Sequence, residues 1–125
     1  MKLFKNLLLL LVAIILGVIL IPIGVIFAVV KFLIISNYKT AYNIITDLIF
    51  NMALGIDQLG NTSCKYFFNA TLIKDDSIQF GDVDETVSSV LGKNYLANNL
   101  TKTGKALNFI LDSIDAKHSI KSIGI

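Results

Sequence analysis

Few residues in this chain have side chains that could act together in a reaction. The only such set combines carboxylates, a hydroxyl and an imidazole, which can support proton transfer, and it consists of Asp84, Glu85, Ser88 and His118. Their spacing does not establish a site, because acidic residues and serines before an apolar segment also begin helices. We favour the interpretation that Asp82 or Asp84 caps a helix, that Ser88 and Ser89 are solvated, and that His118 lies on a frayed C-terminus. No enzymatic activity is therefore predicted.

Metal and cofactor sites are not predicted either. Zinc needs three or four nearby N, S or O ligands, whereas the chain has one His and one Cys, Cys64. Residues 91–94 contain a Gly-Lys pair without the earlier glycine and preceding strand of a phosphate-binding loop. All 11 basic residues are lysines, against 9 acidic residues, so the chain has no guanidinium for bidentate recognition of phosphate or base edges. Nucleic acid is not an expected partner.

The composition is that of a membrane protein. Hydrophobic residues make up 54% of the chain and charged residues 16%, with a mean hydropathy of +0.72, outside the averages of soluble globular domains. Residues 7–30 carry no charge, and a helix over them is about 36 Å long, longer than a hydrocarbon core of about 30 Å. We predict a basic flank at residues 1–6 and a transmembrane helix at residues 7–35.

A cleaved secretory signal is the competing interpretation, because Lys2 and Lys5 precede the apolar segment. The apolar segment is, however, about twice as long as a usual signal core. The best cleavage position, near Ala28, also lacks the small-x-small pattern. We therefore expect the segment to be retained as a single-pass anchor.

Features within the apolar segment bear on helix packing. Pro22 removes a backbone donor and should kink the helix. Gly17 and Gly24 are small enough to let a second helix approach, although they do not form a Gly-x-x-x-Gly pair. The expected partners are therefore the lipid bilayer and either a second copy of the chain or another membrane protein.

A second helix is predicted within residues 36–60. Apolar residues recur there at steps of three and four and form one wide stripe. Polar residues interrupt the stripe, among them Asp47, Asn51, Asp57 and Gln58. This pattern favours an amphipathic helix on the bilayer or on a partner, with a second membrane crossing as the alternative.

The rest of the chain divides into a connecting segment and a small helical region. Residues 61–81 are polar at both ends with an aromatic and β-branched middle, which predicts a loop or a short β-hairpin. In residues 82–125 we expect a short helix from Asp82 to Gly92. A last helix, from about Thr103 to Ala116, should pack on the second helix. The predicted fold class is mainly α.

Several short motifs of the chain are distinctive, namely Asp57-Gln58 with Asn61, the stretch from Asp84 to Ser89, and the ending at His118. They resemble motifs of small, functionally uncharacterised membrane proteins of tailed bacteriophages and prophages. That family typically has an Asp-Gln pair in an apolar helix, an Asp-Glu-Thr-[Ile/Leu]-Ser-Ser stretch after a proline, and an ending that contains a histidine. The similar residues here are Asp57, Gln58, Asn61, Asp84, Glu85, Thr86, Val87, Ser88, Ser89 and His118. Val83 and Ala116 stand where the family has prolines, and residues 61–81 look like an insertion.

The resemblance implies a phage-encoded protein of the host bacterial inner membrane and implies no known reaction. Together with the apolar helix, it leads us to expect a non-enzymatic membrane protein that acts by helix association. Holin-like or lysis-accessory action and a superinfection factor are the two roles that fit. A virion or genome-entry membrane protein and a membrane-anchored enzyme are the alternatives.

Overall fold

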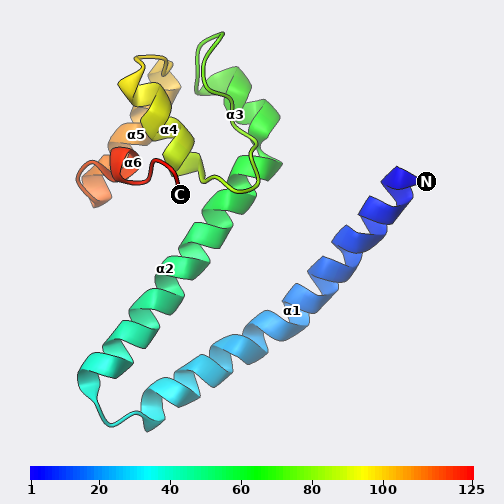
Figure 1. Cartoon of the computed structure of the whole chain (residues 1–125), viewed down its shortest axis with the longest axis vertical. Helices are drawn as coiled ribbons and strands as arrows, with labels where there is room; N and C mark the ends of the chain where they lie inside the picture. Colours follow the sequence, from blue (N-terminus) through cyan, green and yellow to red (C-terminus); the bar gives the residue numbers. More distant parts are fainter. The chain divides into compact units, whose positions relative to one another are not determined.

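The computed structural model describes residues 1–125 and is helical almost throughout, which confirms the mainly α fold class. Its only β feature is one antiparallel bridge between Ile73 and Leu100. The chain divides into two compact units, residues 1–50 and residues 51–125, which are described separately. The helices in order (Figure 1) are α1 (Lys2–Ile34), α2 (Tyr38–Ser63), α3 (Lys65–Thr71), α4 (Val87–Leu96), α5 (Lys102–Ile114) and α6 (His118–Lys121).

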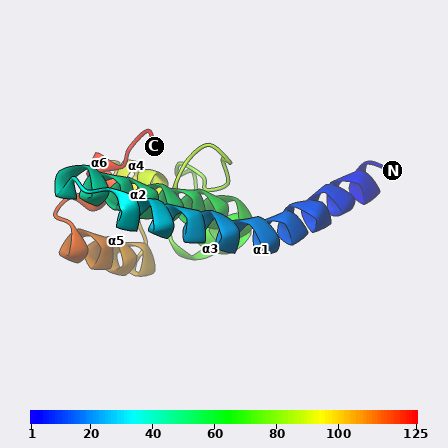
Figure 2. The same ribbon diagram turned by 90° about the horizontal axis from the view of Figure 1, so that it is seen from below.

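The helix α1 forms most of the first unit. It has 33 residues, none of them buried, and at about 1.5 Å per residue it is about 50 Å long. It is the one helix long and apolar enough to cross a membrane, a test that signal sequences also pass. Pro22 lies inside the helix without ending it, and Figure 2 shows α1 as one continuous helix.

The turn after α1 is closed by a side chain. The backbone of Ile35 is extended, which stops the helix. The Oδ1 atom of Asn37 then accepts hydrogen bonds from the backbone N–H groups of Lys39 (3.0 Å) and Thr40 (3.4 Å). These bonds satisfy amide groups that the first turn of a helix leaves without partners.

The helix α2 is longer than the sequence pattern indicated. It continues through Gly60 to Ser63, beyond the predicted end at residue 60 and into the segment predicted as a loop or hairpin. It belongs to the first unit up to Phe50 and to the second unit from Asn51 onward. Its 26 residues are enough to cross a bilayer, but only α1 is also sufficiently apolar.

The predicted β-hairpin within residues 61–81 is not formed. The aromatic segment after Cys64 is the helix α3 instead. Phe68 packs against the hydrophobic core, with its ring 5.4 Å from that of Phe80 in an edge-on arrangement, while Phe67 stays exposed. Packing of Phe68 against the core overrides the β preference of these residue types.

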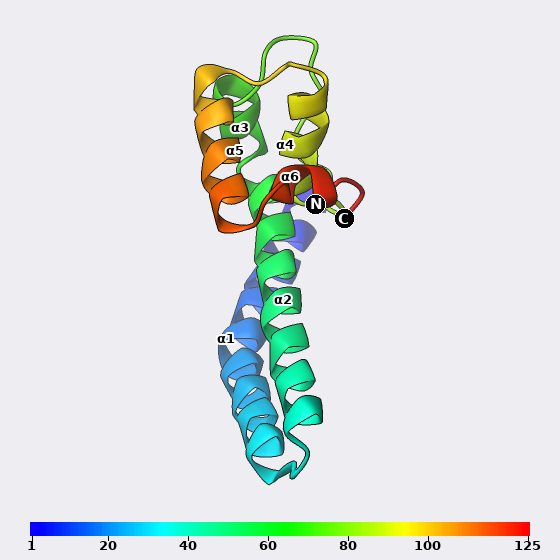
Figure 3. The same ribbon diagram turned by 90° about the vertical axis from the view of Figure 1, so that its left-hand side faces the viewer.

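The second unit is built around a small apolar core. Its buried members come from the end of α3, the following loops and α4, and they are Leu72, Ile73, Phe80, Val90, Leu91 and Leu100. Figure 3 shows α4, α5 and α6 grouped together, and α4 contacts both other helices. The helix α5, predicted to pack on the second helix, packs mainly on α4 and α6.

Two glycines permit close approaches within this unit. Gly92 was predicted to end a helix, but it lies in the middle of α4, where a Cβ atom would overlap the backbone oxygen of Ser119 in α6. A Cβ atom at Gly104 would likewise overlap the backbone oxygen of Leu72. Both positions therefore need glycine for its lack of a side chain.

The predicted start of α4 is also wrong. Asp82 does not cap the helix; its Oδ1 atom accepts a hydrogen bond from the backbone N–H of Asp84 (3.0 Å) within the preceding turn. The N-cap is Thr86, whose Oγ1 accepts from the backbone N–H of Ser89 (3.0 Å). Threonine is among the preferred N-cap residues because its hydroxyl reaches this amide.

Candidate functional site

The motif residues of α2 and those before and within α4 lie against one another. The carboxylate of Asp57 accepts two hydrogen bonds, from the backbone N–H of Val87 to Oδ1 (2.8 Å) and from the Ser88 hydroxyl to Oδ2 (2.7 Å). A carboxylate at this position satisfies unpaired amide groups and interacts favourably with the helix dipole. The acidic cap of α4 is therefore supplied by a residue far away in the sequence.

Two amides of α2 hold the turn that leads into α4. The side chain of Asn61 is completely buried. Its nitrogen donates to the backbone oxygens of Asp82 (3.0 Å) and Glu85 (2.7 Å), and its oxygen accepts from the backbone N–H of Gly81 (2.9 Å). Gln58 adds a longer bond, 3.4 Å, to the backbone oxygen of Asp84. The Asp84 side chain itself is exposed.

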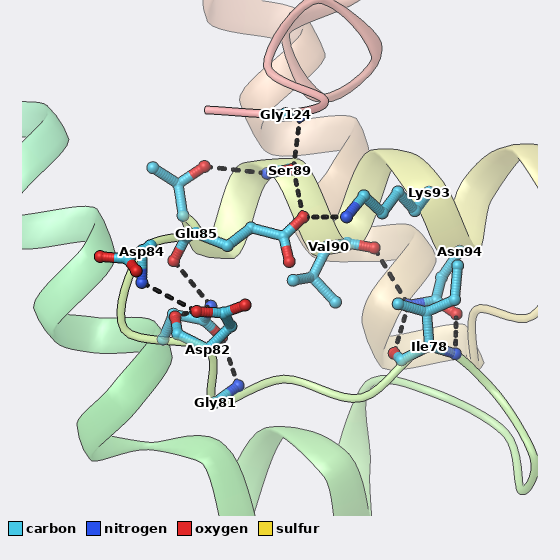
Figure 4. Close-up of polar contacts among 12 residues, drawn as sticks. Ile78, Gly81, Asp82, Asp84, Glu85, Ser89, Val90, Lys93, Asn94 and Gly124 are labelled. Atoms are coloured by element: carbon cyan, nitrogen blue, oxygen red, sulfur yellow. Dashed lines mark hydrogen bonds and ion pairs between the residues drawn. The ribbon is translucent and has the colours of Figure 1, made fainter.

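Glu85 and Ser89 join α4 to the end of the chain (Figure 4). The Ser89 hydroxyl donates to Glu85 Oε1 (2.6 Å) and accepts from the backbone N–H of Gly124 (2.9 Å). Lys93 forms an ion pair with the same Glu85 oxygen. In addition, the backbone N–H of Thr86 donates to the backbone oxygen of Ile125 (2.9 Å). Every polar atom of the Ser89 side chain is thus engaged.

The expectation that Ser88 and Ser89 are solvated is wrong. Ser88 is 4% exposed and Ser89 is 0% exposed. Thr86 is 1% exposed. The three hydroxyls have the hydrogen-bond partners given above, because buried polar groups that lack partners are costly. A hydroxyl held in this way has no open side from which to attack a substrate.

His118 does not join the other motif residues. It begins α6, which packs on α4, so it does not lie on a frayed end as expected. Its Nδ1 atom lies 3.3 Å from Asp115 Oδ2, and Lys121 Nζ lies 2.7 Å from Asp115 Oδ1. The hydrogen bond from Lys121, and secondarily that from His118, lowers the pKa of Asp115 below its ordinary value of 3.8. The acid, hydroxyl and imidazole are therefore not assembled into one site.

Two further asparagines, which the sequence did not single out, perform the same task as Asn61. Asn69 of α3 bonds to both the N–H (2.7 Å) and the oxygen (3.2 Å) of Phe80. Asn94 of α4 bonds to both the N–H (3.1 Å) and the oxygen (2.8 Å) of Ile78. Each amide thus pairs with the backbone as a neighbouring strand would.

The three asparagines fix the loop between α3 and α4 from three helices. Asparagine is a poor helix former, but solvated asparagines are found at similar positions, so the sequence carried no signal for Asn69 and Asn94. The arrangement is a structural joint between α2, the loop and α4. No group of three His, Cys, Asp or Glu side chains that could hold a metal ion is present.

The glycines of α1 remain open to a partner helix. A Cβ atom built at Gly24 would meet nothing within 4 Å, and one at Gly17 would meet only Ile21 of the same helix, at 3.6 Å. Either position could therefore accept the surface of another helix.

Comparison of the chain with protein-family models, curated proteins and solved structures finds no match. The resemblance to phage membrane proteins stays a prediction from the sequence.

Proposed function

We propose that this chain is a non-enzymatic, single-pass membrane protein that acts through association of its transmembrane helix. The observation that carries the proposal is α1, which has 33 residues and buries none of them. Its leucine, isoleucine and valine side chains are largely exposed, and burying such side chains is the main favourable term in folding. A bilayer supplies the missing apolar environment.

The proposal includes no enzymatic step, because the reactive side chains in the joint between α2 and α4 already have hydrogen-bond or ion-pair partners. Asp57, Glu85, Ser88 and Ser89 bond to one another, to backbone groups and to Lys93. A nucleophile needs a free approach and a nearby base, and here each hydroxyl donates to a carboxylate that already serves a helix end or an ion pair. The joint instead gives α4 a fixed position on α2.

The open space beside Gly24, where a Cβ atom would meet nothing within 4 Å, supports helix association. Small residues allow transmembrane helices to approach closely, and packing then supplies the attraction that lipid does not. The resemblance at Asp57-Gln58 and Asp84–Ser89 adds a phage setting, with the host inner membrane as location. In that setting the chain acts in lysis as a holin-like component or alters susceptibility to a further infection.

Membrane fractionation of cells that express the intact chain tests the anchor. We expect the protein to stay with membranes after a carbonate wash and to keep its N-terminal residues when measured by intact mass. Leu10→Lys, Leu16→Lys and Leu20→Lys together should release a large fraction, because each cation near the centre of a helix costs about 3 kcal/mol in membrane insertion, and the many apolar residues of α1 outweigh a single one. Val83→Lys, at an exposed position outside α1, is the matched control. A product that begins after Ala28 would refute the anchor.

Energy transfer between two labelled copies in the bacterial membrane tests helix association. We expect an energy-transfer signal between the copies. Gly24→Leu should abolish this signal, because the larger side chain keeps the second helix away from the backbone of α1. Ile26→Leu changes an exposed neighbour without adding volume and should have no effect. Equal signals from both variants would contradict association through this face.

Measurement of membrane potential separates the two phage roles. Holin-like action predicts a sudden collapse after the chain accumulates, and Gly24→Leu should delay or prevent it. An unchanged potential throughout expression removes the holin-like role and leaves the superinfection role, which a second phage challenge would test.

A further inference from the structure

The helix α5 has large apolar residues turned outward as well as toward the core. Its buried residues are Gly104 and Asn108. In contrast, Phe109 is 73% exposed, Ile110 55% and Ile114 81%. Leu107 and Leu111 are half-buried and complete the contact with the core. The usual arrangement of a surface helix is the opposite, with polar residues outside.

Polar contacts hold α5 in this orientation. Gly104 lies against the backbone oxygen of Leu72. The N-cap residue Thr101 donates its hydroxyl to the backbone oxygen of Thr71 (2.6 Å), and its backbone N–H donates to the oxygen of Leu72 (3.0 Å). Asn108 lies one turn further along the same buried face. The start of the helix is therefore fixed in rotation about its axis.

The acidic group of α5 is also directed inward. Asp112 is half-buried, and its two carboxylate oxygens accept from the Asn108 side chain (3.3 Å) and from the backbone N–H of Ser119 (3.3 Å). The outward side carries Lys102 and Lys105 instead, both exposed and neither in an ion pair. At about 100° per residue, both lysines lie within about 40° of Phe109 around the helix axis and Lys105 lies about opposite Ile114. The exposed half of α5 therefore has a cationic edge beside Phe109 and an apolar edge at Ile110 and Ile114.

A helix that combines exposed large apolar residues with unpaired lysines is typical of binding in the plane of an anionic bilayer surface. Lysines near such a surface are attracted by phosphate headgroups, while a protein partner would need a matching acidic and apolar face. The anchor proposed for α1 tethers the chain to a bilayer. The tether raises the effective concentration of lipid for any second binding site on the same chain.

We propose that α5 lies in the headgroup region of an anionic bilayer, with Phe109, Ile110 and Ile114 directed into the lipid and Lys102 and Lys105 at the phosphates. This inference rests on the proposed membrane anchor, since tethering favours such shallow binding. It assigns the second unit a lipid-binding face of its own, separate from the polar joint at α4.

Tryptophan fluorescence of the full chain in vesicles tests the inference, because the natural sequence contains no tryptophan. Phe109→Trp reports on α5, Phe27→Trp reports on insertion of α1, and Val83→Trp is the control at an exposed loop position. In vesicles with phosphatidylglycerol, brominated lipids should quench Phe109→Trp and Phe27→Trp severalfold more than Val83→Trp.

The lysines provide a second measurement. Adding K102Q and K105Q to Phe109→Trp should lower the quenched fraction on vesicles with phosphatidylglycerol. On vesicles of phosphatidylcholine alone, quenching should be weaker and unaffected by these two changes. A loss of quenching of the same size on both lipids would contradict attraction of the lysines to the negative charge of the phosphatidylglycerol headgroups.

The outcomes distinguish this inference from the proposed anchor. Quenching of Phe27→Trp without quenching of Phe109→Trp overturns the lipid-binding face and leaves the anchor intact. Absence of quenching at both positions overturns both. A blue-shifted Phe109→Trp that lipid does not quench, and that depends on the protein-to-lipid ratio, means that a second copy covers α5 and also overturns the inference.

Discussion

The helices α1 and α4 meet the demand for apolar surroundings in opposite ways. In α1 the side chains are apolar on all sides and none is buried. In α4 most residues are buried, and three of the buried residues are polar: Ser88, Ser89 and Asn94. The structure gives α1 no apolar surroundings, whereas the chain itself builds the environment of α4 through matched hydrogen bonds. Substitutions in the two helices should therefore have very different consequences for the fold.

Truncation of a buried leucine should give the largest difference between the two helices. Leu91 in α4 is 0% exposed and Leu16 in α1 is 49% exposed. We expect Leu91→Ala to lower the free energy of unfolding of residues 51–125 by about 2–5 kcal/mol, as for other buried leucines. Leu16→Ala should leave it unchanged. Hydrogen exchange of the α4 amides in detergent micelles measures both, and similar losses would contradict the separation.

Removal of the buried Asn61 side-chain amide should give the second-largest loss of stability. Asn61→Ala removes the partner of the Gly81 N–H and of the Glu85 backbone oxygen, while the Asp82 oxygen keeps its bond from the Glu85 N–H. Each unsatisfied buried group costs about 1–3 kcal/mol, so we expect a loss of at least about 2 kcal/mol in the same exchange measurement. Asn51→Ala, at an exposed position of the same helix, is the control. Exchange at Gly81 as slow as in the natural chain would show that water replaces the amide.

A methyl group at Gly92 should have a smaller but specific effect. It would overlap the backbone oxygen of Ser119, so Gly92→Ala should push α6 away from α4 at a cost of about 1–3 kcal/mol. Gly55→Ala, where a Cβ atom meets nothing within 4 Å, should stabilise its helix by about 0.5–1 kcal/mol. Thermal unfolding of the two variants should thus shift in opposite directions.

Acidification should give the smallest effect. The pKa of Asp115 is lowered by its hydrogen bonds to Lys121 and His118. Its contribution to stability is present above its ordinary pKa of 3.8 and is lost as the pH falls through the lowered value. Because Asp115 is exposed, the loss is slight and confined to α6. NMR titration of the α6 amides below pH 4 checks this, and Asp115→Asn should remove the pH dependence.

Much of the helical content follows from periodicity, but the ends of the helices do not. The helix predicted as the last one, from about Thr103 to Ala116, corresponds to α5 to within two residues, since its apolar pattern is strong. The short helix α6 that follows it was not predicted. The predicted end of the second helix at residue 60 was wrong, because Asn61 forms three hydrogen bonds with a loop about twenty residues away. The hairpin failed for a similar reason, since the contact between Phe68 and Phe80 decides the conformation of residues 65–71.

The candidate site was found in part. The resemblance selected Asp57, Asn61 and the residues from Asp84 to Ser89, and the structure brings these together. It did not reveal that they form a joint between helices, because a motif does not show which side chain faces which amide. Asn69 and Asn94 were missed, since nothing in local sequence separates a buried asparagine that pairs with backbone from a solvated one.

The sequence by itself determined that residues 7–30 form an apolar helix, because hydrophobicity over such a length depends on no other part of the chain. Only the tertiary structure decided which polar side chains of α2 and α4 bond to one another and to the loop, and which residues of α5 face outward. Hydrogen bonds are directional, so they depend on the exact positions of groups that folding brings together. The close approaches at Gly92 and Gly104 then fix which side of each helix remains exposed.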